Sequence, residues 1–302
     1  MGTPGDAYFD HVAFGPTGTL PTTIPINQQG LTGAWYEPVT SGQGFQVSIA
    51  PSVDVTGGGT LFGAWYTYDA VAGGTDTQRW YSLQASLTDG ARSADVTIYQ
   101  STGGNFAATP SAAAVAVGSG TLAFDSCTSG TFDYAFDDGR AGSIPLSALL
   151  PMVACAETGT YDVPPGLFGL SGAWYDPTTD GQGMLINVDP FVNNAFIGWY
   201  TYAADADFGV GSGVSGQRWL SLQAGFGASG PLWLGINAST GGVFDSEGAA
   251  TTELVGTATL TFASCASATL EYAFTKGEFE GRSGTIDLAR LGATPENCAL
   301  DP

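Results

Sequence analysis

The residues of this chain that are best suited to bind a ligand are aromatic rings that alternate with amide and hydroxyl groups. In segment 78–85, the alternation of an extended strand places Leu83 on one face and places Trp80 and Gln84 together on the other. The first face is typical of a core, whereas the second combines an indole with polar groups. The complete set of candidate binding residues is Tyr66, Tyr68, Trp80, Gln84, Tyr99, Tyr200, Tyr202, Trp219, Gln223 and Trp233.

Flat rings beside amides and hydroxyls are typical of a site for a neutral sugar, which stacks its apolar face on a ring and bonds its hydroxyls to the polar groups. The same residues would also serve as wedges in a small barrel, with their polar ends bonded to the backbone. The two interpretations differ in the expected effect of Trp80→Ala or Trp219→Ala. Truncating an exposed indole would weaken binding and leave the fold intact, whereas truncating a buried one would cost about 3–5 kcal/mol of stability.

No set of residues in the sequence predicts catalysis or metal binding. His11 is the single histidine and lies outside the repeat described below. Glu37 and Asp176 occupy equivalent positions of two separate repeated segments, whereas the two carboxyls of a glycosidase lie within roughly 5–10 Å of each other in one cleft. Asp205 and Asp207 stand near several glycines, but their spacing differs from that of an EF-hand calcium loop. We therefore expect no enzyme activity, no cofactor and no metal.

The charge balance argues against nucleic acid as a partner. Seven Lys and Arg residues against 28 Asp and Glu residues give a net charge of −21, so a polyanion would be repelled. No apolar run approaches the roughly 20 residues that cross a bilayer as a helix. We therefore expect no transmembrane segment, and the charge itself favours solubility.

Six motifs occur twice in the same order, which indicates a tandem duplication. They are Gly-Ala-Trp-Tyr at 33–36 and 172–175, Gly-Gln-Gly at 42–44 and 181–183, Trp-Tyr-Thr-Tyr at 65–68 and 199–202, Gln-Arg-Trp at 78–80 and 217–219, Ser-Thr-Gly-Gly at 101–104 and 239–242, and Tyr-Ala-Phe at 134–136 and 272–274. The sequence therefore predicts an extended N-terminal arm over 1–30, a first domain over 31–156 and a second domain over 157–302.

The four cysteines follow the repeat, because Cys127 and Cys155 in the first copy correspond to Cys265 and Cys298 in the second. One pair in each copy predicts the disulfides Cys127–Cys155 and Cys265–Cys298, and the spacing fits no compact zinc motif. Free buried thiols are the alternative. Disulfides in turn predict a secreted, cell-surface or periplasmic location.

Each copy contains about eight short runs with β-type alternation, which is clearest in segments 45–49 and 96–99. Gly-rich turns such as Asp89-Gly90 separate the runs, and no segment has a sustained helical period. Consecutive strands joined by short turns favour an all-β chain of two tandem antiparallel up-and-down β-barrels, with two β-sandwiches as the alternative.

The repeated blocks resemble those of uncharacterised proteins that proteobacteria export. In the first copy the resemblance rests on segments 33–44, 65–68 and 139–146, and it covers nearly the whole repeat. The second copy departs from the pattern at Glu278-Phe279-Glu280, an insertion before Arg282. The resemblance implies export and brings no defined activity.

The Gly-x-Trp that opens each copy, with an arginine before the last predicted strand, resembles the calycin barrels (lipocalins and avidins). In those barrels a tryptophan of the first strand packs near a basic residue of the last. The resemblance therefore implies that Trp35 packs with Arg140 and that Trp174 packs with Arg282.

These observations predict a non-enzymatic extracellular or periplasmic binding protein, with a carbohydrate bound on the aromatic faces. The alternative is a structural protein of the cell surface or of a filament, in which segment 1–30 docks onto another copy or another surface protein. An open, concave aromatic surface would favour the first function, and a detached arm beside an exposed strand edge would favour the second. An enzyme is the third interpretation and would need a deep cleft with two close carboxylates.

Overall fold

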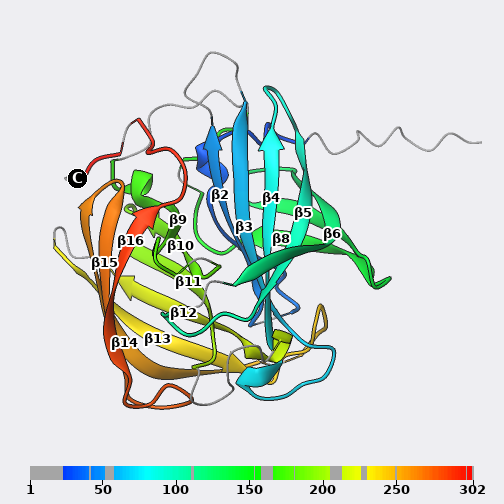
Figure 1. The fold of residues 1–302 in the computed structure, drawn as a ribbon. Helices are drawn as coiled ribbons and strands as arrows, with labels where there is room; N and C mark the ends of the chain where they lie inside the picture. The colour runs from blue at the N-terminus through cyan, green and yellow to red at the C-terminus, as the bar shows by residue number, and fades with distance from the viewer. Residues whose placement is uncertain are drawn as a thin grey trace, which may run out of the picture.

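Each copy of the repeat forms a closed antiparallel barrel of eight strands that follow one another around the wall (Figure 1). The computed structural model describes residues 23–40, 42–51, 58–109, 112–152, 154–157, 166–179, 181–204, 213–225, 230–248, 250–296 and 298–300. In each barrel the first strand pairs with both the second and the eighth, which closes the sheet. The prediction of two up-and-down barrels is therefore confirmed over the alternative of two sandwiches.

The two barrels have the same order of elements. The first consists of η1 (Gln29–Leu31), β1 (Gly33–Tyr36), β2 (Gly44–Pro51), β3 (Gly59–Tyr68), η2 (Thr75–Thr77), β4 (Gln78–Leu87), β5 (Ser93–Thr102), β6 (Ala113–Phe124), β7 (Ser129–Phe136) and β8 (Ala141–Ala148). The second consists of η3 (Gly166–Leu170), β9 (Gly172–Tyr175), β10 (Gly183–Asp189), β11 (Asn194–Tyr202), η4 (Gly213–Gly216), β12 (Gln217–Gly225), β13 (Leu232–Thr240), β14 (Thr251–Ser264), β15 (Ser267–Phe274) and β16 (Ser283–Arg290).

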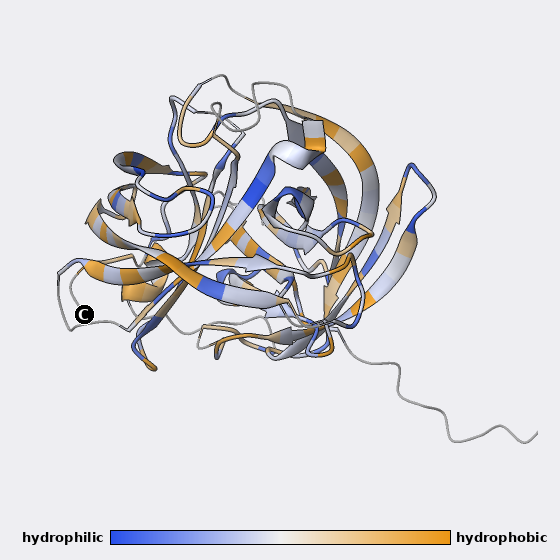
Figure 2. Cartoon of the chain, turned by 90° about the horizontal axis from the view of Figure 1, so that it is seen from below, coloured by the Kyte–Doolittle hydropathy of each residue, from blue (hydrophilic) through white to orange (hydrophobic). Residues whose placement is uncertain are grey.

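The strands form where apolar and polar residues alternate, because one side of each strand faces a barrel interior and the other side faces outward. Bands of contrasting hydropathy follow one another along the ribbons (Figure 2). In β5, for example, Ala94, Val96 and Ile98 are buried and the residues between them are more exposed. The turn from β4 to β5 contains Gly90 with φ +68°, a left-handed conformation that glycine adopts without a steric penalty.

The interior of each barrel is filled by aromatic and branched side chains. In the first barrel, the Trp65 ring packs on Phe45 and Phe132 with centroid separations of 5.2 and 5.6 Å. In the second, Trp199 packs on Tyr272 at 5.5 Å. The interior of an eight-stranded barrel is wide enough for packed side chains or for one small ligand, and in these barrels the described aromatic rings pack on one another inside it.

One phenylalanine from each copy enters the barrel of the other copy. Phe106, which follows β5, packs on Trp199 and Phe279 of the second barrel at centroid separations of 5.3 and 4.3 Å. Phe244, which follows β13, packs on Trp65 of the first barrel at 5.2 Å. We call Phe106 and Phe244 the plug residues. Each barrel core is thus completed by a side chain of the other copy.

Two equivalent glutamines hold the plug segments in place. Gln43 Nε2 donates a hydrogen bond to the carbonyl of Val243 at 3.1 Å. Gln182 Nε2 donates to the carbonyl of Asn105 at 3.0 Å. The repeated Gly-Gln-Gly motif therefore positions the plug residue that arrives from the other copy.

Both predicted disulfides, Cys127–Cys155 and Cys265–Cys298, are present. Each joins the turn between the sixth and seventh strands of its barrel to the chain that follows the eighth strand. Disulfides are compatible with an extracellular or periplasmic location. No helix in the described part of the chain is long and apolar enough to cross a membrane.

The described part of the predicted N-terminal arm, residues 23–30, packs along the first barrel. The amide of Ile24 donates to the carbonyl of Phe124 and that of Ile26 to the carbonyl of Ala91, both at 2.8 Å. Both isoleucine side chains are buried in the first core. The rest of the arm, with His11, lies outside the described residues.

The arginine over the first-strand tryptophan of the second barrel is not the one that the calycin resemblance implied. The guanidinium of Arg290 lies 4.6 Å from the Trp174 ring centroid, and Arg290 is the last residue of β16 and pairs with Trp174. Arg282 precedes β16, and at the rise of about 3.3 Å per residue it stands a full strand length away.

The first barrel differs from the implied packing in the same way. Arg140 precedes β8, whereas Trp35 pairs with Ala148 at the other end of that strand. The Arg140 guanidinium instead lies 4.4 Å from the Phe136 ring centroid and 4.8 Å from that of the plug residue Phe244. Arg140 therefore helps to hold the plug in the mouth of the first barrel.

Candidate functional site

Most of the predicted aromatic faces lie against each other between the two barrels. We call this contact the barrel–barrel interface, and its central rings are Tyr66, Tyr68, Trp80, Tyr200, Tyr202 and Trp219. None of the six is more than 6% exposed. Alternation correctly kept the two indoles off the barrel cores, but the other barrel covers the faces that carry them. These six rings are therefore not an open surface.

The interface repeats the hydrogen bonds of its two tryptophans in both directions. Trp80 Nε1 donates to the carbonyl of Thr201, and Trp219 Nε1 donates to the carbonyl of Thr67, both at 3.0 Å. The Trp80 ring packs on Tyr200 at a centroid separation of 5.0 Å. Each indole therefore buries its ring and also satisfies its polar group on the opposite barrel.

The glutamines before these tryptophans form a second reciprocal pair. Gln78 Nε2 donates to the carbonyls of Trp219 and Ser239, both at 2.9 Å. Gln217 Nε2 donates to the carbonyls of Trp80 and Ser101, at 2.8 and 3.2 Å. The repeated Gln-Arg-Trp motif thus joins the two copies. The repetition of the motif is visible in the sequence, but the sequence does not indicate which strand of the other copy the motif contacts.

The other four candidate residues are divided between a pocket and the outer surface. Gln223 is exposed to solvent, and it also lines the pocket described next. Gln84 is exposed and Tyr99 is half-buried. Trp233 is 75% exposed on the outside of β13. Of the ten candidates, Tyr66, Trp219 and Gln223 meet in the pocket and the other seven are not among its lining residues.

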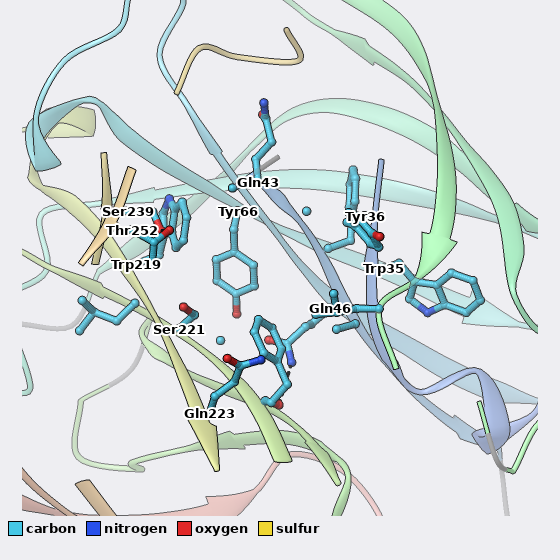
Figure 3. Close-up of a pocket in the computed structure, with 18 residues that line it drawn as sticks. Trp35, Tyr36, Gln43, Gln46, Tyr66, Trp219, Ser221, Gln223, Ser239 and Thr252 are labelled. Atoms are coloured by element: carbon cyan, nitrogen blue, oxygen red, sulfur yellow. Dashed lines mark hydrogen bonds between the residues drawn. The ribbon is translucent and has the colours of Figure 1, made fainter. Parts of the chain in front are cut away.

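A pocket of about 270 Å³ opens at the barrel–barrel interface and takes its walls from both barrels. The first barrel contributes Tyr36, the start of β2 and Tyr66, and the second contributes Gly198, segment 219–221 and Gln223. Figure 3 shows the Tyr66 ring in the middle of the lining residues, with Trp219 on one side and Gln46 and Tyr36 on the other. Asp, Glu, Lys, Arg and His do not occur among the described residues that line it.

Two polar atoms in this pocket are buried without a hydrogen-bond partner among the described residues. They are the hydroxyl oxygen of Tyr66 and Oε1 of Gln46. Gln46 Nε2 donates to the carbonyl of Phe196 at 3.3 Å, which directs Oε1 to the other side of the amide. An unsatisfied buried polar group costs about 1–3 kcal/mol, so a hydrogen-bonding group that reached either oxygen would stabilise the protein.

Gly198 makes the space in which these two oxygens lie. A Cβ added at this glycine would overlap both Gln46 Oε1 and the Tyr66 hydroxyl. Burial raises the pKa of the Tyr66 phenol well above its ordinary value, and the neighbouring Tyr200 raises it further. The hydroxyl therefore stays protonated and can donate a hydrogen bond, whereas Gln46 Oε1 can only accept one.

The described acidic residues that were weighed for catalysis, Glu37 and Asp176, are not among the residues that line this pocket. Asp176 Oδ1 accepts from the backbone amide and from the hydroxyl of Thr178, both at 2.8 Å, which is an ordinary turn arrangement. Burial, followed by the nearby Asp245, raises the pKa of Glu37. Asp205 and Asp207 lie outside the described residues. Within the described ranges, no group of three or more His, Cys, Asp and Glu residues could hold a metal ion.

Comparisons of the chain with protein-family models, with curated protein sequences and with solved structures found no match. The function is therefore inferred from the chemistry of the pocket.

Proposed function

We propose that this protein is an extracellular or periplasmic binding protein that holds a small neutral saccharide in the pocket at the barrel–barrel interface. The observation that carries the proposal is the pair of unpartnered buried atoms, one donor on Tyr66 and one acceptor on Gln46. A folded protein hydrogen-bonds most of its buried polar atoms. A bound molecule with polar groups would satisfy both.

The lining favours an uncharged ligand with an apolar face. It contains aromatic rings, amides and hydroxyls and no charged side chain among its described residues. A net charge of −21 also disfavours anionic ligands. Small-molecule sites commonly measure about 300–1,000 Å³, so a pocket of about 270 Å³ suits a ligand of one or two rings. The two disulfides support an extracellular or periplasmic setting.

The proposal is tested by binding measurements with the purified protein. A glycan array is screened first, and isothermal titration then measures glucose, galactose, N-acetylglucosamine, lactose and cellobiose. We expect at least one of these neutral saccharides to bind. Tyr66→Phe should weaken that binding about tenfold, since it removes one hydrogen bond to the bound sugar.

Tyr200→Phe is the matched control, because Tyr200 is the repeat equivalent of Tyr66 and does not line the pocket. Tyr200→Phe should change the affinity of the wild-type protein by less than about twofold, which is a smaller change than the loss of a hydrogen bond causes. The proposal is wrong if no saccharide binds on the array or in titration. It is also wrong if the two tyrosine variants weaken binding equally.

A further inference from the structure

The barrel–barrel interface has two pseudo-equivalent halves that differ at two central positions. We call them the Tyr66 half, around Tyr66 and Trp219, and the Tyr200 half, around Tyr200 and Trp80. Counted from the repeated Trp-Tyr of the first strands, Gln46 in the Tyr66 half corresponds to Leu185 in the Tyr200 half.

The second difference is a glycine. Counted from the Trp-Tyr-Thr-Tyr motifs, Gly198 in the Tyr66 half corresponds to Ala64 in the Tyr200 half. Leu185 and Ala64 are both buried in the apolar cluster of the interface. Neither side chain has a polar atom, so the Tyr200 half has no acceptor at the position that corresponds to Gln46.

The two differences depend on each other. The position of a Cβ at residue 198 is the place where Gln46 Oε1 and the Tyr66 hydroxyl lie. An alanine there, as at position 64, would displace both oxygens. The glutamine and the glycine therefore make one polar recess together, whereas the leucine and the alanine fill the equivalent space.

Most of the other positions that line the pocket are the same in both halves. Trp219, Ser221, Gln223 and Ser239 correspond to Trp80, Ser82, Gln84 and Ser101. Phe45 and Leu220 differ from their equivalents but belong to the barrel cores. Thr252 replaces Ala114 and adds a hydroxyl. The change in hydrogen bonding beside the paired tyrosines thus rests on Gln46 and Gly198.

We infer that the chain has one hydroxyl-recognising site, in the Tyr66 half, and that Gln46 and Gly198 are the residues that confine it there. The inference rests on the proposed function. A hydroxyl both accepts and donates a hydrogen bond, so a single sugar hydroxyl satisfies Tyr66 and Gln46 at once. A carbonyl or ether oxygen can only accept, and an ammonium group can only donate.

The number of sites is tested with the saccharide that binds the wild-type protein in the titrations above. Wild-type protein should bind one molecule per chain. The double variant Gln46→Leu with Gly198→Ala copies the residues of the Tyr200 half, which the fold already accommodates. It should keep a cooperative melt and lose binding by about 100-fold or more, because the acceptor and the recess are both removed.

The opposite exchange, Leu185→Gln with Ala64→Gly, should raise the number of molecules bound per chain from one to two. The inference is overturned if the wild-type chain binds two molecules, if the first variant melts normally and keeps its affinity, or if the second melts normally and still binds one. Absence of any saccharide binding by the wild-type protein would instead overturn the proposed function, so the two failures are distinct.

The shared hydroxyl is tested with monodeoxy derivatives of the same saccharide. At one ring position, loss of the hydroxyl should weaken binding to the wild-type protein about tenfold or more, and should weaken binding to Tyr66→Phe by less than about twofold. Such coupling identifies the hydroxyl that contacts Tyr66. If every deoxy derivative weakens both proteins equally, the assigned contact is wrong.

Discussion

Replacing Tyr66 by phenylalanine should stabilise the empty protein while it weakens ligand binding. The substitution removes only the hydroxyl, which is buried and has no partner among the described residues. The ring keeps its contact with Trp219, at a centroid separation of 5.8 Å. Since a buried unsatisfied hydroxyl costs about 1–3 kcal/mol, we expect the free energy of unfolding to rise by about 1–2 kcal/mol.

Tyr68→Phe is the control for this prediction. Tyr68 is also fully buried at the barrel–barrel interface, but its hydroxyl donates to the carbonyl of Gly42 at 3.0 Å. Its removal leaves that carbonyl without the bond, so the free energy of unfolding should fall by about 1–2 kcal/mol. The two variants delete the same atom from neighbouring residues and should change stability in opposite directions.

Urea titration and calorimetry measure both variants without ligand. A gain of 1 kcal/mol corresponds to a rise in melting temperature of about 2–4 °C for a chain of this order of size. If Tyr66→Phe lowers the melting temperature as much as Tyr68→Phe does, the Tyr66 hydroxyl already has a partner and the reasoning about the pocket fails. With saturating saccharide the advantage of Tyr66→Phe over the wild-type protein should largely disappear, because tenfold weaker binding removes about 1.4 kcal/mol of ligand stabilisation.

Three other changes have measurable consequences. Trp80→Ala and Trp219→Ala should each lower the free energy of unfolding by about 3–5 kcal/mol in urea, since both indoles are buried; losses below about 1 kcal/mol would fit an exposed residue instead. Phe244→Ala should cost about 3–5 kcal/mol by emptying the mouth of the first barrel, and an unchanged melting temperature would mean that the plug is not seated there. Replacing Cys127 and Cys155 by alanine should cost about 3–4 kcal/mol, whereas peptide mapping that finds a bridge between the copies would contradict the pairing.

The barrels and the disulfides could be predicted because their signals are local or repeated. Alternation such as that of Val96 and Ile98 in β5 depends on one strand and its two faces. The pairing of Cys127 with Cys155 follows from one cysteine pair in each copy. Neither prediction depends on how the two copies contact each other.

The covering of Trp80 and Trp219 could not be predicted by the same reasoning. Alternation assigns a side chain to a face of a strand but does not say what lies over that face. Here the other barrel covers it and leaves both indoles no more than 5% exposed. The plug residues Phe106 and Phe244 were missed for a related reason. Each follows a repeated Gly-Gly, but only the structure reveals that it enters the other barrel.

The arginine that packs on Trp174 was predicted wrongly, because the calycin resemblance was applied by position in the sequence alone. Arg282 and Arg140 are equivalent in the repeat, and both were predicted to pack with the first-strand tryptophans. In an antiparallel pair, however, the residues that meet are fixed by the register of the two strands. That register places Arg290 beside Trp174, and the equivalent position of the first barrel is Ala148.

The pocket depends on differences between the copies, whereas the repeated motifs consist of the residues that the copies share. The shared residues, such as Trp80 and Trp219, build the barrel–barrel interface. The unshared ones, Gln46 and Gly198, carry the unpartnered oxygen and the space around it. A position-by-position comparison of the repeats would have shown both substitutions, although not that they meet across two barrels.

The duplication also explains why the site lies between the barrels. Gln43 lines the pocket and at the same time holds the segment of the plug residue Phe244. Tyr66 comes from one copy and Gly198 from the other, so neither copy contains the whole recess. Each core also receives the plug residue of the other copy, so Gln43 links the contacts that fill the first barrel to those that shape the pocket. The unshared residues Gln46 and Gly198 thus lie in one half of the interface, whereas Leu185 packs in the apolar cluster of the other half.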